Sequence, residues 1–162
     1  MTPNQPPTRL LMPDEALVIL NCSRSKLVTS APIPALELYQ GACVPHAREH
    51  FASDPARRAR IRILSAEHGL LRPDDLISTY DRRLRTRADA LCLHEQTVSG
   101  QLDAELADTP ALRHLLIIVE PLYLLALQQV FDRPDRLEHL AIVTSPWAWH
   151  DGLEHLRRWG WA

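Results

Sequence analysis

Lysine is nearly absent from this chain, because Lys26 is the only one among its 18 lysine and arginine residues. Lysine carries a compact charge on a flexible stem, and unlike arginine it can lose its proton when buried. In a composition that favours arginine this strongly, one retained lysine indicates a position that needs an ammonium group. We therefore treat the segment around Lys26 as a candidate binding loop.

Cysteine is also scarce, and long apolar runs are missing. The three cysteines have no paired spacing, which argues against a disulfide framework and a four-ligand zinc site and favours a cytoplasmic location. No apolar run approaches the roughly 20 residues of a membrane-spanning helix, and the N-terminus lacks a signal-peptide pattern. We expect no membrane association.

The charge balance also has little excess of either sign. A formal net charge of −2 and a pI near 6.4 argue against a whole-protein electrostatic grip on nucleic acid, for which a basic domain is expected. Arginine is concentrated in two runs, residues 57–60 and 82–87, which we interpret as solvated helix faces. A local basic patch stays open as an alternative.

The length of 162 residues fits one domain, since domains usually contain about 100–200 residues. Residues 1–15 contain four prolines and are predicted to form a flexible N-terminal lead-in. We place the single domain at residues 16–162.

Four short apolar runs rich in β-branched residues predict strands, at residues 16–20, 61–64, 115–119 and 140–143. The runs are continuous rather than alternating, which is typical of strands covered on both faces. Helical patterns lie between them, at residues 36–52 with a break near Gly41 and Pro45, and at 88–107, 121–131 and 152–159. The order predicts a three-layer α/β domain with a mainly parallel sheet of four to five strands and helices on both faces.

Ligands of open parallel sheets bind outside the carboxyl ends of the strands, so the loops that follow the four runs should form the site. The first loop offers backbone amides, small polar side chains and two cations that suit an anion: Asn21, Ser23, Arg24, Ser25 and Lys26. It contains no glycine, which excludes a Walker loop and a dinucleotide-binding fingerprint. Cys22 is interpreted as a packing residue, because Val28 stands where a cysteine phosphatase needs arginine.

The second loop begins at the end of the run 61–64. Glu67 and His68 are candidates for acid–base catalysis, although a capping or packing role for His68 is equally open. Gly69 permits a tight turn. Tyr80 and Asp81 further on offer a stacking ring and a carboxylate, or a polar exit from the turn.

Two further candidates follow the last two strands. Glu120 ends a very apolar strand beside a predicted helix start, where a carboxylate could serve as nucleophile or general base in glycosyl chemistry. Trp147 could wall a pocket for a flat base or could pack on the domain.

The stretch of residues 46–50 matches the H-x-x-E-H pattern of some zinc peptidases, but the order of elements differs from theirs. We therefore predict no metal site, and no cofactor.

The stretches LVILNCSRSK, ALELYQGACV and ILSAEHGLLRPDDLISTYDRRL together resemble the peroxide stress protein YaaA family, over about residues 16–84. The third block carries most of the likeness, through Ser65, Gly69, Leu71, Pro73, Asp75, Ile77 and Tyr80. Tyr39 begins the aromatic-x-Gly segment of the second block. The resemblance implies an α/β fold and a pocket that includes Tyr39, Ser65 and Asp75, but it supplies no reaction.

Two departures from that family matter. His68 stands where the family has an aromatic residue, usually tyrosine, and the first loop is Asn-Cys-Ser-Arg-Ser-Lys rather than Ser-Pro-Ala-Lys. The family is associated with DNA binding and protection against oxidative damage. The inserted helical region implicated in DNA contact has no counterpart in this chain, so DNA binding is not the favoured inference.

The leading hypothesis is an enzyme that handles a nucleotide or nucleobase-containing small molecule, of the N-glycosidase or base-transferring type. In it, the first loop holds a phosphate and Glu120 acts at the sugar. Two alternatives stay open: a non-catalytic nucleic-acid-binding stress module, and a small-molecule binding domain in a modification cluster. The oligomeric state is left open.

Overall fold

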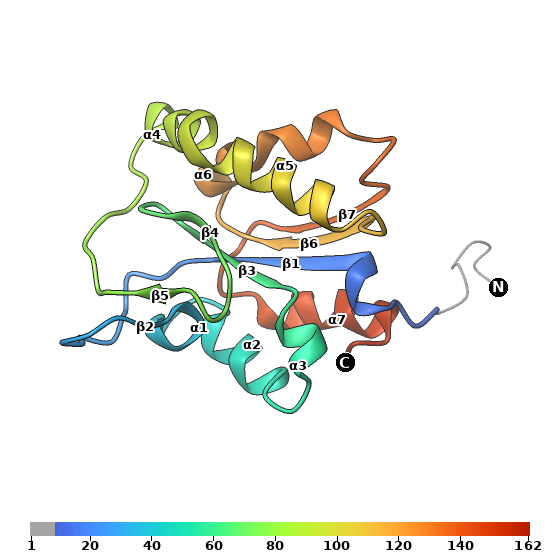
Figure 1. The fold of residues 1–162 in the computed structure, drawn as a ribbon, viewed down its shortest axis with the longest axis horizontal. Helices are drawn as coiled ribbons and strands as arrows, with labels where there is room; N and C mark the ends of the chain where they lie inside the picture. The colour runs from blue at the N-terminus through green and yellow to red at the C-terminus, as the bar shows by residue number, and fades with distance from the viewer. Residues whose placement is uncertain (1–8) are drawn as a thin grey trace.

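A five-stranded sheet forms the centre of the computed structural model, which describes residues 9–162 (Figure 1). The strand order is β4-β3-β1-β6-β7, and all neighbours are parallel except β3 and β4. The five strands are β1 (Ala16–Asn21), β3 (Ile61–Ser65), β4 (Gly69–Leu71), β6 (His114–Ile118) and β7 (His139–Val143).

Helices cover both faces of this sheet. Figure 1 shows α4, α5 and α6 on one side and α1, α2, α3 and α7 on the other. Their bounds are α1 (Ala35–Leu38), α2 (Val44–His50), α3 (Pro55–Arg58), α4 (Arg87–Leu93), α5 (Ser99–Asp108), α6 (Pro121–Leu124) and α7 (Trp149–Trp159). A π-helical turn, His94–Val98, joins α4 to α5, and a 3-10 helix, Leu125–Asp132, continues α6. The predicted three-layer α/β fold with a mainly parallel sheet is confirmed.

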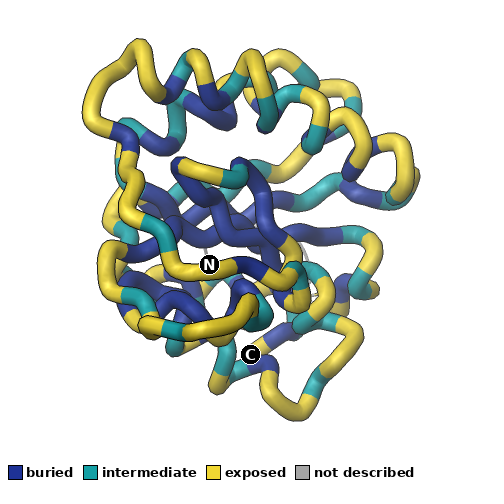
Figure 2. The backbone as a smooth tube through the Cα atoms, turned by 60° about the vertical axis from the view of Figure 1, so that its left-hand side comes forward, coloured by how far each residue is buried: buried dark blue, intermediate teal, exposed yellow. Residues whose placement is uncertain are grey.

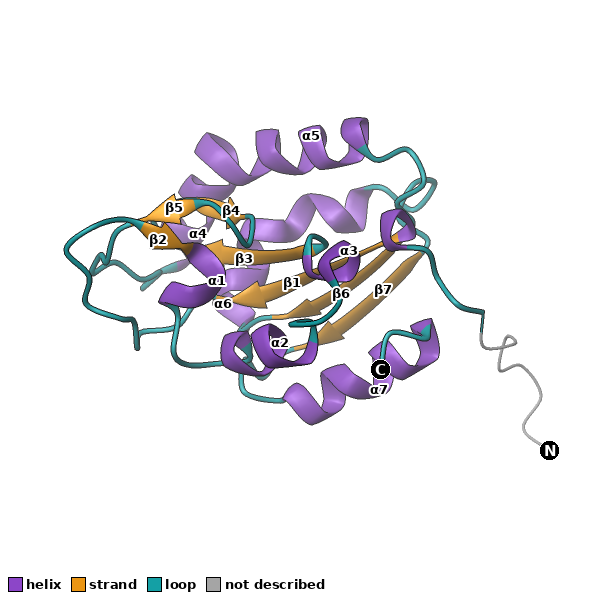
Figure 3. Cartoon of the chain, turned by 60° about the horizontal axis from the view of Figure 1, so that its bottom comes forward, coloured by secondary structure: helices purple, strands orange, loops and turns teal. Residues whose placement is uncertain are grey.

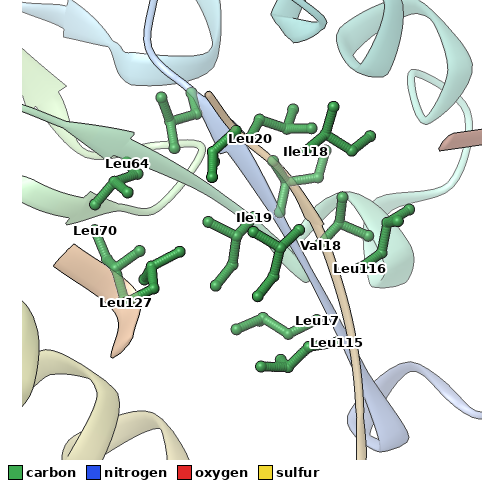
Figure 4. Close-up of a cluster of buried hydrophobic side chains, with 14 of the residues drawn as sticks. Leu17, Val18, Ile19, Leu20, Leu64, Leu70, Leu115, Leu116, Ile118 and Leu127 are labelled. Atoms are coloured by element: carbon green, nitrogen blue, oxygen red, sulfur yellow. The ribbon is translucent and has the colours of Figure 1, made fainter. Parts of the chain in front are cut away.

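The burial of the central strands explains their continuous apolar runs. Every residue of β1 and β3 is buried, as are four of the five residues of β6. Figure 2 shows these strands as the dark blue centre of the chain, and Figure 4 shows side chains of β1 and β6 packed together. Both faces of a strand between two helical layers exclude water, so no polar alternation is needed.

Three features differ from the predictions. The strand β4 pairs antiparallel with β3 after a tight turn, and a separate two-stranded sheet joins β2 (Ile33–Pro34) to β5 (Leu76–Ile77). The interpretation of residues 82–87 as a helix face is wrong for 82–86, because α4 begins only at Arg87 and the preceding residues are irregular. The strands β2 and β5 have two residues each, too few to show a period.

A buried ion pair ties the sheet to the helical layer above it. Arg62 on β3 and Glu105 on α5 are 3 % and 6 % exposed. The Nε atom of Arg62 contacts Oε1 of Glu105, and its Nη2 atom donates to Oε2 at 3.1 Å. Paired geometry of this kind offsets part of the large cost of removing two charges from water.

Residues 9–15, the described part of the predicted lead-in, contact the C-terminal end of the chain. The amide of Leu11 donates to the carbonyl of Trp159 at 3.0 Å, and the indole of Trp161 donates to the carbonyl of Leu11 at 2.9 Å. A 3-10 turn, Pro13–Glu15, then leads into β1. Residues 1–8 of the lead-in lie outside the described residues.

In the described part of the chain, no helix combines the length and the apolar character needed to cross a membrane.

Candidate functional site

A cleft of about 310 Å³ lies at the carboxyl ends of the central strands. The parallel strands β1, β3, β6 and β7 point toward the same edge, as their arrows in Figure 3 show. The loop after β1 supplies one wall through Asn21, Cys22, Ser23, Arg24 and Lys26. The volume is at the small end of the range for small-molecule pockets, about 300–1,000 Å³.

Backbone contacts fix the shape of this loop. The hydroxyl of Ser23 donates to the carbonyl of Ser25 at 2.6 Å and accepts the amide of Gly41 at 3.1 Å. A Cβ atom at Gly41 would come within 3.0 Å of Ser23 and 3.3 Å of Trp147, so only glycine fits this approach without displacement. The hydrogen of Ser23 is already donated, which leaves Arg24 and Lys26 as the cationic side chains that this loop presents to the cleft.

Lys26 rests on a pair of tyrosine rings. Its Nζ atom lies 4.5 Å from the ring centroid of Tyr80 and 5.9 Å from that of Tyr39. A lysine placed over an aromatic face is attracted by the electron-rich ring. A β-bridge pairs Lys26 with Tyr39, so the backbone is held as well as the side chain.

A chain of three hydroxyls lies beneath Lys26. The hydroxyl of Tyr80 lies 2.7 Å from that of Ser65 and 2.6 Å from that of Tyr39. Ser65 also accepts the amides of Glu67 and His68. Burial raises the pKa of Tyr39 to about 12 and raises the pKa of Tyr80 as well. Both phenols are therefore neutral at physiological pH, and they act as a platform for Lys26.

The second wall of the cleft comes from the segment between Tyr80 and α4. Asp81, Arg82, Arg83 and Arg85 line the cleft from this side. The sequence interpretation missed the arginines because it placed their run on a helix. Their position directly after Tyr80 and Asp81, two residues already predicted for the site, is the signal that could have found them.

Glu120 and Trp147 complete the cleft, as predicted from their places after β6 and β7. The amide of Glu120 donates to Oδ1 of Asn21 at 3.0 Å, which ties the ends of β1 and β6 together. Within residues 9–162, the carboxylate of Glu120 has no hydrogen-bond or ion-pair partner. Trp147 is 69 % exposed, which is unusual for so large an apolar side chain. Both groups are free to contact a ligand.

The thiol of Cys22 also borders the cleft but is only 8 % exposed. It lies 3.6 Å from the hydroxyl of Tyr123. Burial raises the pKa of this thiol, so the reactive thiolate is disfavoured. The geometry agrees with a packing role for Cys22.

Eight predicted site residues do not line the cleft, and most have structural contacts instead: Ser25, Tyr39, Ser65, Glu67, His68, Gly69, Asp75 and Tyr80. Tyr39, Ser65 and Tyr80 form the platform under Lys26. Glu67 makes an exposed ion pair with Arg82 at 3.5 Å, and His68 packs edge-to-face on Tyr80.

Gly69 and Asp75 shape the turns of the same block. Gly69 has a φ of +70°, and a Cβ atom there would come within 2.3 Å of Oε1 of Gln101. That oxygen accepts the amide of Leu70. The carboxylate of Asp75 accepts the amide of Arg72 at 2.8 Å. Residues 65–80 of the block therefore supply turns and packing contacts, and only its last residues, Asp81, Arg82 and Arg83, line the cleft.

The two histidines of the H-x-x-E-H stretch make aromatic and backbone contacts. His46 stacks on Trp149, and the ring of His50 hydrogen-bonds the carbonyl of Trp161. In the described range, no group of three or more His, Cys, Asp and Glu side chains is placed to hold a metal ion.

The fold and the cleft define the class: a three-layer α/β domain with a small, cation-rich cleft at the carboxyl edge of its sheet. Residues 17–135 match the family of unknown function DUF6884, and the chain therefore belongs to that family. No curated protein matches the chain in sequence. The family match ends before β7, so Trp147 lies outside it.

Proposed function

We propose that the chain is an enzyme that handles a nucleotide or nucleobase-containing small molecule, of the N-glycosidase or base-transferring type. The observation that carries this proposal is the meeting of Lys26, Glu120 and Trp147 in one small cleft. A cation, a carboxylate without a partner and an exposed indole suit the phosphate, the sugar and the base of one nucleotide.

Each group has a role in breaking the bond between C1′ and the base nitrogen. Glu120 stabilises the positive charge that develops at C1′ and takes a proton from the water, or from the acceptor hydroxyl, that attacks this carbon. The bonding electrons leave with the base, which takes up a proton. Asp81 is the second carboxylate in the cleft, and we assign it to pass a proton from solvent to the departing base, in place of Glu67 and His68.

A screen of nucleosides and nucleotides for release of free base tests the reaction. We expect Glu120→Gln to abolish turnover and to retain ligand binding, because the amide keeps the size of the side chain but cannot act as a base. Lys26→Ala should weaken binding by about tenfold, as expected for loss of one charged contact. Glu95→Gln is the control, since Glu95 is exposed and lies away from the cleft. Normal turnover in Glu120→Gln rules out the assignment.

A second candidate is a nucleic-acid-binding module without catalysis, because three arginines of the run 82–87 line the cleft. The DNA binding associated with the peroxide stress protein family suggests this candidate, while the missing helical region of that family and the net charge of −2 count against it. Phosphate-dominated binding falls steeply with salt. If the protein shows no salt-dependent retention on single-stranded or duplex DNA, this second candidate is excluded.

The compartment that we propose is the cytoplasm. The three cysteines, Cys22, Cys43 and Cys92, are free thiols, as a reducing compartment favours.

A further inference from the structure

The segment Asp81–Arg85 is held in place at both ends, although it has no regular structure. Tyr80 before it is fixed by the hydroxyl chain. Leu84 within it is 6 % exposed, and its amide donates to the hydroxyl of Tyr123 at 3.3 Å. Thr86 after it caps α4 by accepting the amide of Asp89. The arginines on either side of Leu84 are therefore presented to the cleft by an anchored backbone, which lowers the entropy lost when a ligand binds.

The cations of the cleft differ from most others in the molecule. Across residues 9–162, most arginine side chains pair with a carboxylate or donate to a backbone carbonyl. Six cationic side chains of that range do neither: Arg24, Lys26, Arg83, Arg85, Arg87 and Arg158. Four of these line the cleft, from both walls, and the other two lie elsewhere. Unpaired cations thus gather where a ligand would bind.

The charge and size of the cleft set limits on that ligand. Five cations and two carboxylates line it, a surplus of three positive charges. A terminal phosphate carries about −1.5 to −2 at neutral pH and a linking phosphate adds about −1, so a nucleoside 5′-diphosphate carries about −3 and its ester about −2. The volume of about 310 Å³ is at the small end of the range for small-molecule pockets, so the part of a ligand that the cleft encloses is small.

We propose that the ligand of this cleft is a nucleoside 5′-diphosphate or its ester, with the diphosphate held between the two walls. Arg24 and Lys26 bind it from the loop after β1, and Arg83 and Arg85 bind it from the anchored segment. This inference rests on the proposed function, whose sugar and base contacts it keeps, and it names the substrate class.

Binding of inorganic pyrophosphate and inorganic phosphate to the full chain tests the inference without knowledge of the base. By calorimetry, pyrophosphate should bind at least about tenfold more tightly than phosphate, because it meets cations from both walls. Arg83→Gln and Arg85→Gln should each weaken pyrophosphate binding by about tenfold. Arg87→Gln is the matched control, since Arg87 belongs to the same run but does not line the cleft. All three side chains are exposed, so the variants should fold as the parent does.

Equal binding of the two anions, or an equal loss in Arg87→Gln, overturns the inference. A second comparison then separates a free diphosphate from an ester. It measures binding and base release for a nucleoside, its 5′-monophosphate, its 5′-diphosphate and a dinucleotide such as NAD. If base is released from uncharged nucleosides and pyrophosphate binds no more tightly than phosphate, the diphosphate ligand is refuted and the proposed reaction is not. Tight pyrophosphate binding without any base release refutes the proposed reaction alone.

Discussion

The buried pair between Arg62 and Glu105 makes a sharp prediction about stability. Glu105→Ala leaves the guanidinium of Arg62 in a position that is 3 % exposed, with its remaining bonds going to the carbonyls of Ala59 and Ile61. Removal of one partner from a buried ion pair typically destabilises a protein by about 3–5 kcal/mol. In a domain of this size each kcal/mol lowers the melting temperature by about 2–4 °C. We therefore expect a drop of about 6–20 °C.

The same helix offers the control. Asp103 on α5 pairs with Arg133, but both side chains are substantially exposed, at 52 % and 39 %. Exposed pairs contribute about 0–1 kcal/mol, so Asp103→Ala should change the melting temperature by no more than a few degrees. Urea and thermal unfolding followed by circular dichroism measure both variants.

The reasoning also predicts the effect of replacing both charges. Arg62→Met combined with Glu105→Leu removes the desolvated charges together, so it should be much more stable than Glu105→Ala alone. A Glu105→Ala variant within 1 kcal/mol of the parent would refute the argument. It would show that the guanidinium finds solvent or another partner.

Three further predictions concern the hydroxyl chain, a histidine and the thiols. Tyr80→Phe removes a hydroxyl that joins two others, so it should lower the free energy of unfolding in urea by about 1–3 kcal/mol. Pyrophosphate binding should persist, and its loss would contradict the platform role of Tyr80. Burial, and then the ring of His139, lowers the pKa of His114 below 6.5. As the pH is lowered, His114 is therefore protonated in the unfolded chain before it is protonated in the folded chain. Its contribution to stability is full above about pH 6.5 and is lost as the pH drops through the folded pKa. The variant His114→Gln should reduce this loss of stability when melting is measured against pH, and an unchanged profile would contradict the prediction. Of the three thiols only Cys92 is exposed, so a thiol reagent should label one group rapidly in the native chain and the other two only after unfolding.

The main architecture could be predicted from the sequence because strands between two helical layers appear as short, continuous apolar runs. The run 16–20 has no polar residue, and the strand β1 that contains it is buried throughout. In contrast, β4 has three residues and depends on a turn at Gly69 that Gln101, far along the chain, helps to hold. No local pattern reports such a distant contact.

The site was predictable only where strand ends decide the position. Glu120 and Trp147 follow parallel strands and reach the cleft with the loop around Lys26. The residues after β3 behave differently, because that strand turns back into an antiparallel neighbour. Glu67 and His68 therefore stay outside the lining. The segment at Arg83 was missed for another reason, since its position depends on anchors at Tyr80 and Leu84 that composition does not show.

The amides of the turn after β3 fix the direction of one hydrogen bond in the hydroxyl chain beneath Lys26, the bond between Ser65 and Tyr80. Ser65 accepts two amide hydrogens, which uses both lone pairs of its oxygen, so its own hydrogen goes to Tyr80. Between Tyr80 and Tyr39, either hydroxyl can donate the hydrogen. Burial raises the pKa of Tyr80 and outweighs the bond from Ser65, which favours ionisation of this phenol, so no phenolate forms beside the ammonium of Lys26. Burial of the two rings, rather than the turn, therefore leaves Lys26 without an internal anionic partner and open to an anion arriving from solvent.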